Sequence, residues 1–393
     1  MTAPESQQPA SRYRWAVLLS SVLAFTMYAY ALQSVPPLLQ QFQAIFNVNA
    51  ATAGLLMSMV VVPGIILALP AGIIINKYSF RKIGFLSTIT IAIGSLIMAL
   101  SLSFPMALLG RFIIGLGGGL LGVGTPAIVP QWFEHQEMGR AMSVFAVGMP
   151  AGTVAAFFSA PILSQSFGWQ SPFYVGVLVS IPSAIFFWVT VRDGPLKGDS
   201  TANVSDVWQT LTNREVWKAS LVWMFFNMAA IGFLTWAPDL FVTFKGLTPL
   251  NASVFSSLIM VSILFFIPVI GYVSDRSGMR KPLIIASLAL MALILYVMTY
   301  LNGTSLAASV IILGAAASSV PPLIMATTAQ TLPPKLASMS FSTVALWQNI
   351  GIALIAPIVG YFLGATNSFL PTFLILSIFA IIGAAVAFTL RSR

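Results

Sequence analysis

The sequence contains no cysteine and a single histidine, His135, among its 393 residues. Without cysteine there is no disulfide framework, no thiolate nucleophile and no cysteine-ligated metal. With one histidine, zinc hydrolase and cysteine protease chemistry have little material to work with. The sequence therefore predicts no metal site, no cofactor and no enzymatic activity.

Charge is also scarce. Charged residues make up 7% of the chain and hydrophobic residues 58%, and the mean hydropathy is +0.94, whereas about a quarter of the residues of soluble domains are charged. Lipid is therefore the main solvent. The formal charge of +9 would suggest a nucleic-acid partner in a soluble protein, but here its distribution indicates membrane topology, so no nucleic-acid partner is predicted.

The hydrophobic residues form distinct segments of about 20 residues, the length that a helix needs to cross a bilayer. We therefore predict an all-α membrane protein with twelve transmembrane helices. The predicted segments are 15–35, 52–75, 83–102, 106–129, 142–163, 173–191, 218–242, 252–273, 283–301, 306–329, 337–363 and 369–390.

The basic residues fall almost entirely on one side of this map. Only Lys245, in a loop on the other face, and Arg111, inside a helix, depart from the pattern. Positive-inside bias then predicts a multi-pass protein of the cell (plasma or inner) membrane with both termini in the cytoplasm. The polar start, 1–11, lacks the basic region of a signal peptide, so the first segment is expected to be an uncleaved anchor.

Landmarks recur along the chain at a nearly constant offset. Pro36 corresponds to Pro238 and Gly72 to Gly271, and the same relation links Pro126 with Pro322 and Ala160 with Ala356, at offsets of 202, 199, 196 and 196 residues. Six-helix repeats are typical of transporters, with the substrate between them. We predict an N-terminal bundle over 1–191, a cytoplasmic linker over 192–214 and a C-terminal bundle over 215–393. Ser205 can begin a short surface helix in the linker, with solvated loop as the alternative.

The most specific motif follows the eighth segment. Residues 271–281 read G-x-x-x-D-R-x-G-x-R-K, and here the sequence resembles the major facilitator superfamily over essentially its whole length. The resemblance implies two pseudo-symmetric six-helix bundles that alternate access to a central substrate. It also implies that Asp275, Arg276 and Arg280 latch the cytoplasmic side, while Gly271 lets helices approach and Gly278 permits a tight turn. Ordinary topogenic charge is the alternative.

The first-half counterpart, 72–82, departs from this pattern, because Asn76 replaces the aspartate. Asn76 can form hydrogen bonds but carries no charge, so the latch is expected to be asymmetric. Arg81 and Arg140 complete the predicted cytoplasmic gate.

Arg111 begins an R-x-x-x-G-x-G element that resembles another family motif, ahead of the glycine run 117–119. A buried arginine costs about 2.5 to 3.5 kcal/mol at a helix centre, so Arg111 is expected to face an aqueous cavity and to need an anion. Residues 132–141 resemble the W-F-x-x-x-E-R-x-x-A loop of organic-anion branches. The alternatives are that Arg111 snorkels to the outer surface and that the glycines serve close helix packing.

Further candidates are polar residues inside the apolar segments. Asp239 is the only intramembrane carboxylate, which can carry a coupling proton or cation or pair with Lys245 at the interface. The remaining substrate-site candidates are Thr26, Tyr30 and Gln33, which form one polar stripe at i, i+4 and i+7, and Asn227, Trp236, Gln348 and Asn349 in the second half. Interfacial aromatics and helix–helix hydrogen bonds are the alternative for each.

Together these features predict a monomeric secondary active or facilitative transporter in the lipid bilayer. Its predicted substrate is a small organic anion such as a carboxylate, exchanged or moved with a proton or counter-substrate. The alternatives are a proton-coupled exporter of lipophilic compounds and a membrane receptor or enzyme. Export would favour a G-x-x-x-G-P-x-x-G-G element in the fifth segment, which Gly148-Met-Pro-Ala-Gly152 fits poorly.

Overall fold

In the computed structural model of the chain, residues 13–68, 70, 74, 78–133, 137–192, 194, 210–329 and 337–391 are described, the side chains at 275, 329, 337 and 338 excepted. Within these ranges the regular structure is entirely helical, and twelve helices are long and apolar enough to cross a membrane. The predicted fold class is confirmed: the chain is a multi-pass, all-α membrane protein. The predicted linker helix at Ser205 lies outside the described residues.

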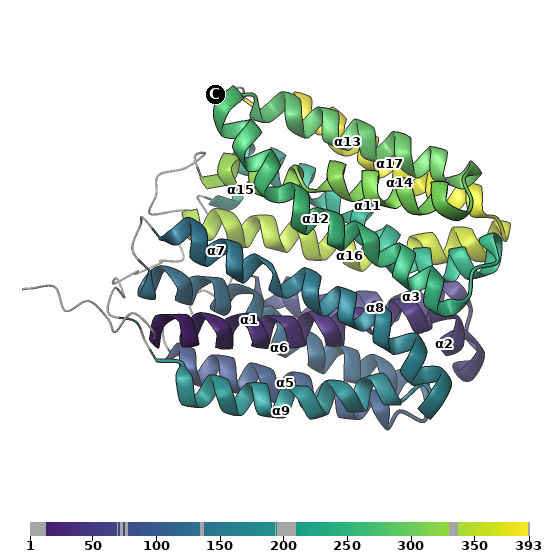
Figure 1. The fold of residues 1–393 in the computed structure, drawn as a ribbon, viewed down its shortest axis with the longest axis horizontal. Helices are drawn as coiled ribbons and strands as arrows, with labels where there is room; N and C mark the ends of the chain where they lie inside the picture. The colour runs from purple at the N-terminus through teal and green to yellow at the C-terminus, as the bar shows by residue number, and fades with distance from the viewer. Residues whose placement is uncertain are drawn as a thin grey trace, which may run out of the picture.

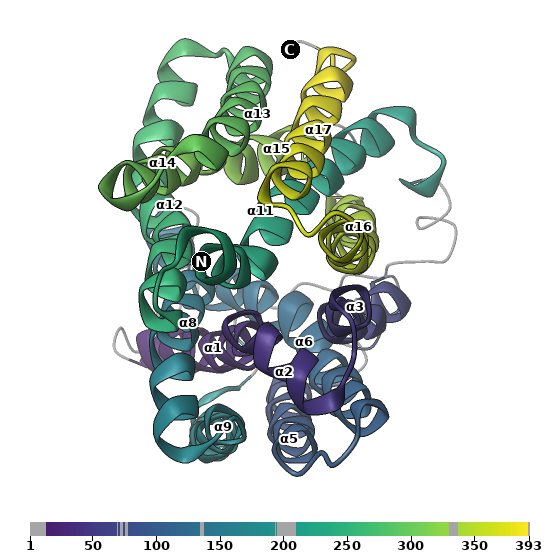
Figure 2. The ribbon, with the colours of Figure 1, turned by 90° about the vertical axis from the view of Figure 1, so that its right-hand side faces the viewer.

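The helices form two groups that lie side by side, one above the other in Figure 1 and seen nearly end-on in Figure 2. The first group contains α1 (Tyr13–Gln33), η1 (Pro36–Leu38), α2 (Leu39–Phe46), α3 (Ala50–Leu67), α5 (Phe80–Ala99), α6 (Phe104–Trp132), α7 (Met138–Ala146), α8 (Gly148–Phe167) and α9 (Ser171–Thr190). The second contains α11 (Arg214–Lys245), α12 (Pro249–Ser277), α13 (Arg280–Val297), η2 (Met298–Tyr300), α14 (Gly303–Ala317), α15 (Val320–Ala329), α16 (Ala337–Thr366) and α17 (Phe369–Phe388).

The two ends of the bundle differ in charge. We call the end where α1 begins and α9 finishes the basic end, because Arg14, Arg81, Arg140, Arg192 and Arg214 lie there; it is on the left of Figure 1. The opposite end carries α2 and the last turn of α11.

The main differences between the observed helices and the predicted segments occur at prolines. Pro36 and Pro37 supply no backbone N–H, so α1 ends at Gln33 and the chain passes through η1 into α2, where a loop was predicted. Pro238, the sequence counterpart of Pro36, lies inside α11, which continues to Lys245. The two halves therefore diverge where the sequence repeat suggested equivalence.

The two groups touch most extensively through α3 and α16, and also through α8 with α12 and η1 with α11. A Cβ added at Gly54 would lie 2.7 Å from the carbonyl oxygen of Ala356, and one at Gly360 would lie 2.5 Å from that of Ala50. These close approaches occur where α3 begins and α16 approaches its end. The groups are therefore packed backbone against backbone at the end opposite the basic one.

This packing predicts a large effect from a single methyl group. Gly54→Ala should lower the stability of the folded protein by about 1–3 kcal/mol, because the added carbon overpacks a backbone contact. Gly364→Ala is the matched control on α16, since nothing lies within 4 Å of its added Cβ. Thermal unfolding in detergent measures both, and equal midpoints would contradict the close-packed interface.

Candidate functional site

A cavity of about 270 Å³ lies between the two groups of helices. Its wall is mainly apolar and comes from α1, α3, α6 and α8 of the first group and from α11 and α16 of the second. Among the described residues that line it, none is charged. The polar side chains of the wall are Tyr28, Gln33, Gln348 and Asn349.

Gln33 is the polar group whose environment most clearly suggests a ligand. It is fully buried, it lines the cavity, and neither its Nε2 nor its Oε1 has a hydrogen-bond partner. Leaving a buried donor or acceptor unpaired costs about 1–3 kcal/mol. Such a group at a cavity wall is suited to donate to, or accept from, a bound solute.

Two further amides reach the cavity from α16. Gln348 accepts a hydrogen bond from Trp223 Nε1 at 2.8 Å through its Oε1, which fixes the amide and leaves its N–H groups as donors. Asn349 packs across to the first group, where a Cβ added at Gly64 would lie 2.7 Å from its Nδ2. Neutral amide groups from both halves therefore line one cavity.

Glycines of α6 form a smooth section of the wall. A Cβ at Gly115 would lie 2.1 Å from the carbonyl oxygen of Val60, and one at Gly118 would lie 1.9 Å from the Tyr28 ring. These two glycines allow α6 to pack against α3 and α1. Gly122 differs, because nothing lies within 4 Å of its added Cβ and it borders the cavity.

Arg111 is fully buried but does not line the cavity. Its guanidinium donates to backbone carbonyls: Nε to Leu56 at 2.8 Å, one terminal nitrogen to Ala31 at 2.9 Å and the other to Leu32 at 3.0 Å. The second of these terminal nitrogens also lies 3.3 Å from the sulfur of Met57. Carbonyls thus occupy the place of the anion that the sequence led us to expect, and the side chain does not snorkel.

The end of α1 explains why Arg111 donates to backbone carbonyls. The last carbonyls of a helix have no partner within the helix, and the residue four positions after Leu32 is Pro36, which has no N–H. Arg111 supplies the missing donors to the end of α1, where the helix dipole also favours a cation. Because Leu32 and Met57 both line the cavity, the guanidinium lies directly behind its wall.

The other predicted substrate residues lie elsewhere. Thr26 and Tyr30 lie against α8. A Cβ added at Gly152 of α8 would lie 2.3 Å from the Thr26 carbonyl oxygen, and Ser159 of α8 donates to the Tyr30 hydroxyl at 3.2 Å. Asn227 donates to the Trp223 carbonyl at 2.8 Å, and Trp236 donates to that of Ala356 at 3.0 Å. The stripe on α1 that does line the cavity is Phe25, Tyr28 and Leu32, with Gln33 beside it.

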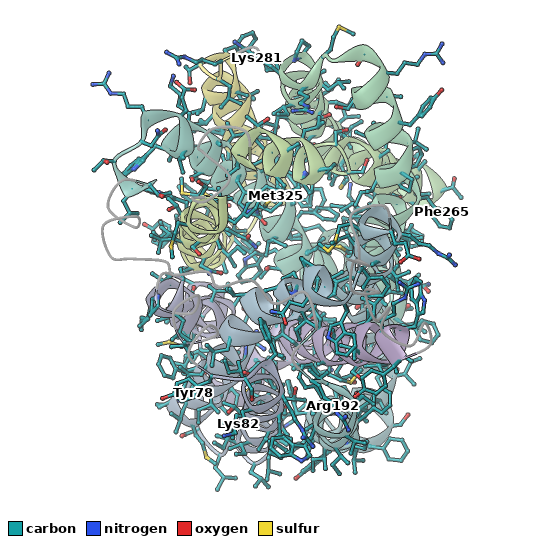
Figure 3. All side chains as sticks on the ribbon, turned by 90° about the vertical axis from the view of Figure 1, so that its left-hand side faces the viewer. Tyr78, Lys82, Arg192, Phe265, Lys281 and Met325 are labelled. Atoms are coloured by element: carbon teal, nitrogen blue, oxygen red, sulfur yellow. The ribbon has the colours of Figure 1, made fainter. Side chains whose placement is uncertain are left out.

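Three of the predicted gate residues, Arg81, Arg140 and Arg276, contact residues of their own group of helices. Arg81 donates to the Trp188 carbonyl at 2.5 Å, the Arg140 guanidinium lies 5.1 Å from the centre of the Trp15 ring, and Arg276 donates to the Tyr272 hydroxyl at 3.1 Å. Each of these contacts stays within one group. Lys82 and Lys281 lie at opposite edges of the basic end (Figure 3).

The glycines of this motif have separate roles. Gly278 ends α12 at φ +66°, a conformation that favours glycine, as the motif suggested. Gly271 has nothing within 4 Å of an added Cβ, so no helix in the described part of the chain approaches it closely. Arg280 begins α13, whereas Asn76 and the side chain of Asp275 lie outside the described part of the chain.

Comparison with known proteins agrees with the architecture. The family model described as Major Facilitator Superfamily matches residues 17–266 and 245–393, and the chain belongs to that family. The fold resembles a bacterial homolog of the human lysosomal transporter Spinster in an inward-facing and occupied conformation, with a TM-score of 0.82 and 16% identity over 97% of both chains. It also resembles the nucleoside transporter NupG, with a TM-score of 0.81 and 14% identity over 96% of this chain and 100% of that one.

Three relatives share weak sequence similarity. A probable nitrate transporter, NarT, of Staphylococcus epidermidis is 25% identical over 64% of this chain, and a probable nitrate/nitrite antiporter, NarK1, of Thermus thermophilus is 25% identical over 68%. The matches span 64% and 63% of those relatives' own lengths. A nitrite extrusion protein of Bacillus subtilis is 22% identical over 70% of this chain and 69% of its own length.

The contacts of Arg111 predict a stability effect. Arg111→Met should lower the free energy of unfolding by several kcal/mol, because each buried carbonyl that loses its donor costs about 1–3 kcal/mol. Arg276→Met, at an exposed position of α12, is the control and should leave the thermal midpoint within error. A midpoint for Arg111→Met equal to that of the control would show that the carbonyls do not depend on Arg111.

Proposed function

We propose that this protein carries a small anion across a membrane by alternating access between its two groups of helices. The observation that supports the proposal most strongly is the cavity between the groups, lined by unpaired or partly paired amides and backed by the buried charge of Arg111. A site enclosed between structural repeats near the middle of the bundle is typical of secondary transporters. We propose a carrier and not an enzyme.

The charge behind the wall favours an anion. Among the described residues, no carboxylate pairs with Arg111. The ion pairs in that part of the chain join Arg14 to Glu137 and Lys218 to Glu215. The end of α1 offsets roughly half of the positive charge through its helix dipole. Opposite unit charges about 8 Å apart attract by about 2 kcal/mol at an effective dielectric constant of about 20, so half a charge contributes about 1 kcal/mol at that separation.

The size of the cavity favours a small solute. Its volume of about 270 Å³ lies just below the range of about 300–1,000 Å³ that holds drug-sized ligands. This supports a small anion over the lipophilic compounds of the exporter alternative. The names of the relatives point to nitrate or nitrite, which we take as first candidates, with small carboxylates second.

The arrangement of the two ends fits one state of the transport cycle. The groups are packed together at the end opposite the basic one, and the contacts of Arg81, Arg140 and Arg276 at the basic end stay within one group of helices. With the basic end in the cytoplasm, as positive-inside bias favours, this is a state closed to the outside of the cell. Both chain termini would then lie in the cytoplasm, and Asp275, Arg276 and Arg280 would latch the basic end in the opposite state.

Uptake by proteoliposomes tests the proposal. The wild-type protein should exchange nitrate or nitrite across the membrane, and Gly122→Leu should reduce that exchange at least tenfold because the new side chain fills the cavity. Gly139→Leu on α7 is the matched control, since its Cβ also has nothing within 4 Å and it lies outside the cavity. Absence of exchange of nitrate, nitrite and small carboxylates by the wild-type protein would contradict the proposal.

Gln33 should show opposite effects on stability and binding. Gln33→Leu should raise the thermal midpoint of the ligand-free protein, because an apolar side chain replaces buried polar atoms that have no partner. The same substitution should weaken the stabilisation that nitrate gives to the wild-type protein, which rises with ligand concentration by mass action. A variant that is less stable, and that nitrate stabilises fully, would remove Gln33 from the site.

A further inference from the structure

A buried carboxylate joins the two groups of helices at the end opposite the basic one. Asp239 on α11 is 7% exposed. Its Oδ2 accepts a hydrogen bond from Gln43 Nε2 of α2 at 3.2 Å, and its Oδ1 accepts one from Thr243 Oγ1 at 3.2 Å. Both partners are neutral, and Gln43 belongs to the other group of helices.

The proposed ion pair with Lys245 is not formed. Lys245 Nζ donates to the Thr299 carbonyl at 2.7 Å and lies 4.7 Å from the centre of the Phe369 ring. Asp239 is therefore a buried acid without a cationic partner among the described residues. An isolated carboxylate is very costly to bury in its charged form, and it becomes neutral instead when a proton is available.

Among the described residues, the elements packed against α11 bring no other charge to this site. The sequences of α2, η1, α15 and α17 contain no titratable residue. The titratable groups of α12 lie in its last turns at the basic end, and Tyr361 of α16 is 64% exposed. On α11 itself, Arg214, Glu215 and Lys218 are at the basic end, which leaves Lys245 as the nearest charge along the helix.

The partners of Asp239 suit both protonation states. Gln43 can present its N–H to a carboxylate, or its carbonyl oxygen to a carboxylic acid after rotation of the amide. The contact lies beside the close packing of α3 and α16 and the hydrogen bond from Trp236 to Ala356. When the groups separate at this end, the contact between Gln43 and Asp239 must break and water can reach the carboxylate.

We propose that Asp239 is a proton-binding site whose occupancy closes the end of the bundle opposite the basic one. A bound proton removes the charge that would otherwise be enclosed, so protonation stabilises the closed state and loss of the proton stabilises the open state. That this site links the movement of the anion to a proton gradient rests on the proposed function. The effect of the proton on closure does not depend on the proposed function.

Single-cysteine labelling measures closure without any substrate, because the chain has no cysteine of its own. Ser58 of α3 is 7% exposed and donates to the Ala353 carbonyl of the second group at 2.5 Å, so Ser58→Cys reports on separation of the groups. Leu102→Cys, at a position 94% exposed, corrects for the dependence of thiol reactivity on pH. Both variants are treated with a maleimide in nanodiscs at pH 5.5 and pH 8.

The corrected labelling of Ser58→Cys should be at least about fivefold slower at pH 5.5 than at pH 8. Adding Asp239→Asn, which mimics the protonated acid, should make labelling slow at both pH values. Adding Asp239→Glu should restore the dependence on pH. Glu215→Gln removes a carboxylate from the same helix at the basic end, where Glu215 pairs with Lys218 at 2.7 Å, and should leave the dependence unchanged.

Two outcomes would overturn the proposal: labelling of Ser58→Cys that does not change with pH, and a change with pH that persists with Asp239→Asn. If Asp239→Asn does not fold, labelling of Ser58→Cys at pH 5.5 is compared between Asp239→Glu and Gln43→Leu. Gln43→Leu removes the bridging amide and should therefore be labelled faster than Asp239→Glu. Equal labelling in those two variants would also overturn it. Labelling that depends on Asp239 in a protein without anion exchange would retain the site and reject the proposed function.

Discussion

The cavity wall depends on the hydrogen bonds from Arg111 to the end of α1 and to α3. Pro36 leaves the Leu32 carbonyl without a helical donor, and a buried carbonyl without a donor is unfavourable in lipid. The guanidinium donates a hydrogen bond to this carbonyl and also to those of Ala31 and Leu56. One side chain therefore fixes α1, α3 and α6 relative to one another, and these three helices form most of the first group's share of the wall.

This arrangement separates electrostatic attraction from hydrogen bonding, whereas an arginine in contact with the anion would provide both. A guanidinium inside the cavity would bind an anion directly and hold it tightly, whereas a charge behind the wall attracts the anion without a hydrogen bond that must be broken on release. In the proposed function, the neutral amides of Gln33, Gln348 and Asn349, which line the cavity, supply the directional hydrogen bonds to the anion. Weak, directional binding suits a carrier, because the solute must leave the site as readily as it enters.

The number and position of the membrane helices could be predicted because lipid permits few alternatives: each apolar stretch must satisfy its own backbone, and only a helix does so within one segment. The family motif at 271–281 added the paired architecture. Of the predicted substrate residues, Gln33, Gln348 and Asn349 line the cavity, and amides are easily noticed in a sequence because they are rare in apolar helices.

The site could not be predicted in full because burial and facing depend on the packing of distant helices. On α1 the polar stripe of Thr26 and Tyr30 faces α8, while Tyr28, which lines the cavity, was not among the predicted site residues. The hydrogen-bond partners of Arg111 could have been predicted in part from the sequence. Two adjacent prolines after α1 lack backbone N–H groups, so carbonyls at the end of that helix need other donors. What the sequence could not show is that α6 brings Arg111 to that end of the helix.

We propose that the positive charge of Arg111 attracts the anion through the wall of the cavity without touching it. Titration of nitrate into the purified wild-type protein and two variants tests this proposal. Arg111→Lys, which keeps the charge, should bind nitrate within about twofold of the wild-type protein. Arg111→Met removes a full unit charge and leaves the dipole of α1 in place, so it should bind nitrate about thirtyfold more weakly, as expected for about 2 kcal/mol. Equal affinity in the methionine variant, or equal weakening in both variants, would contradict the account.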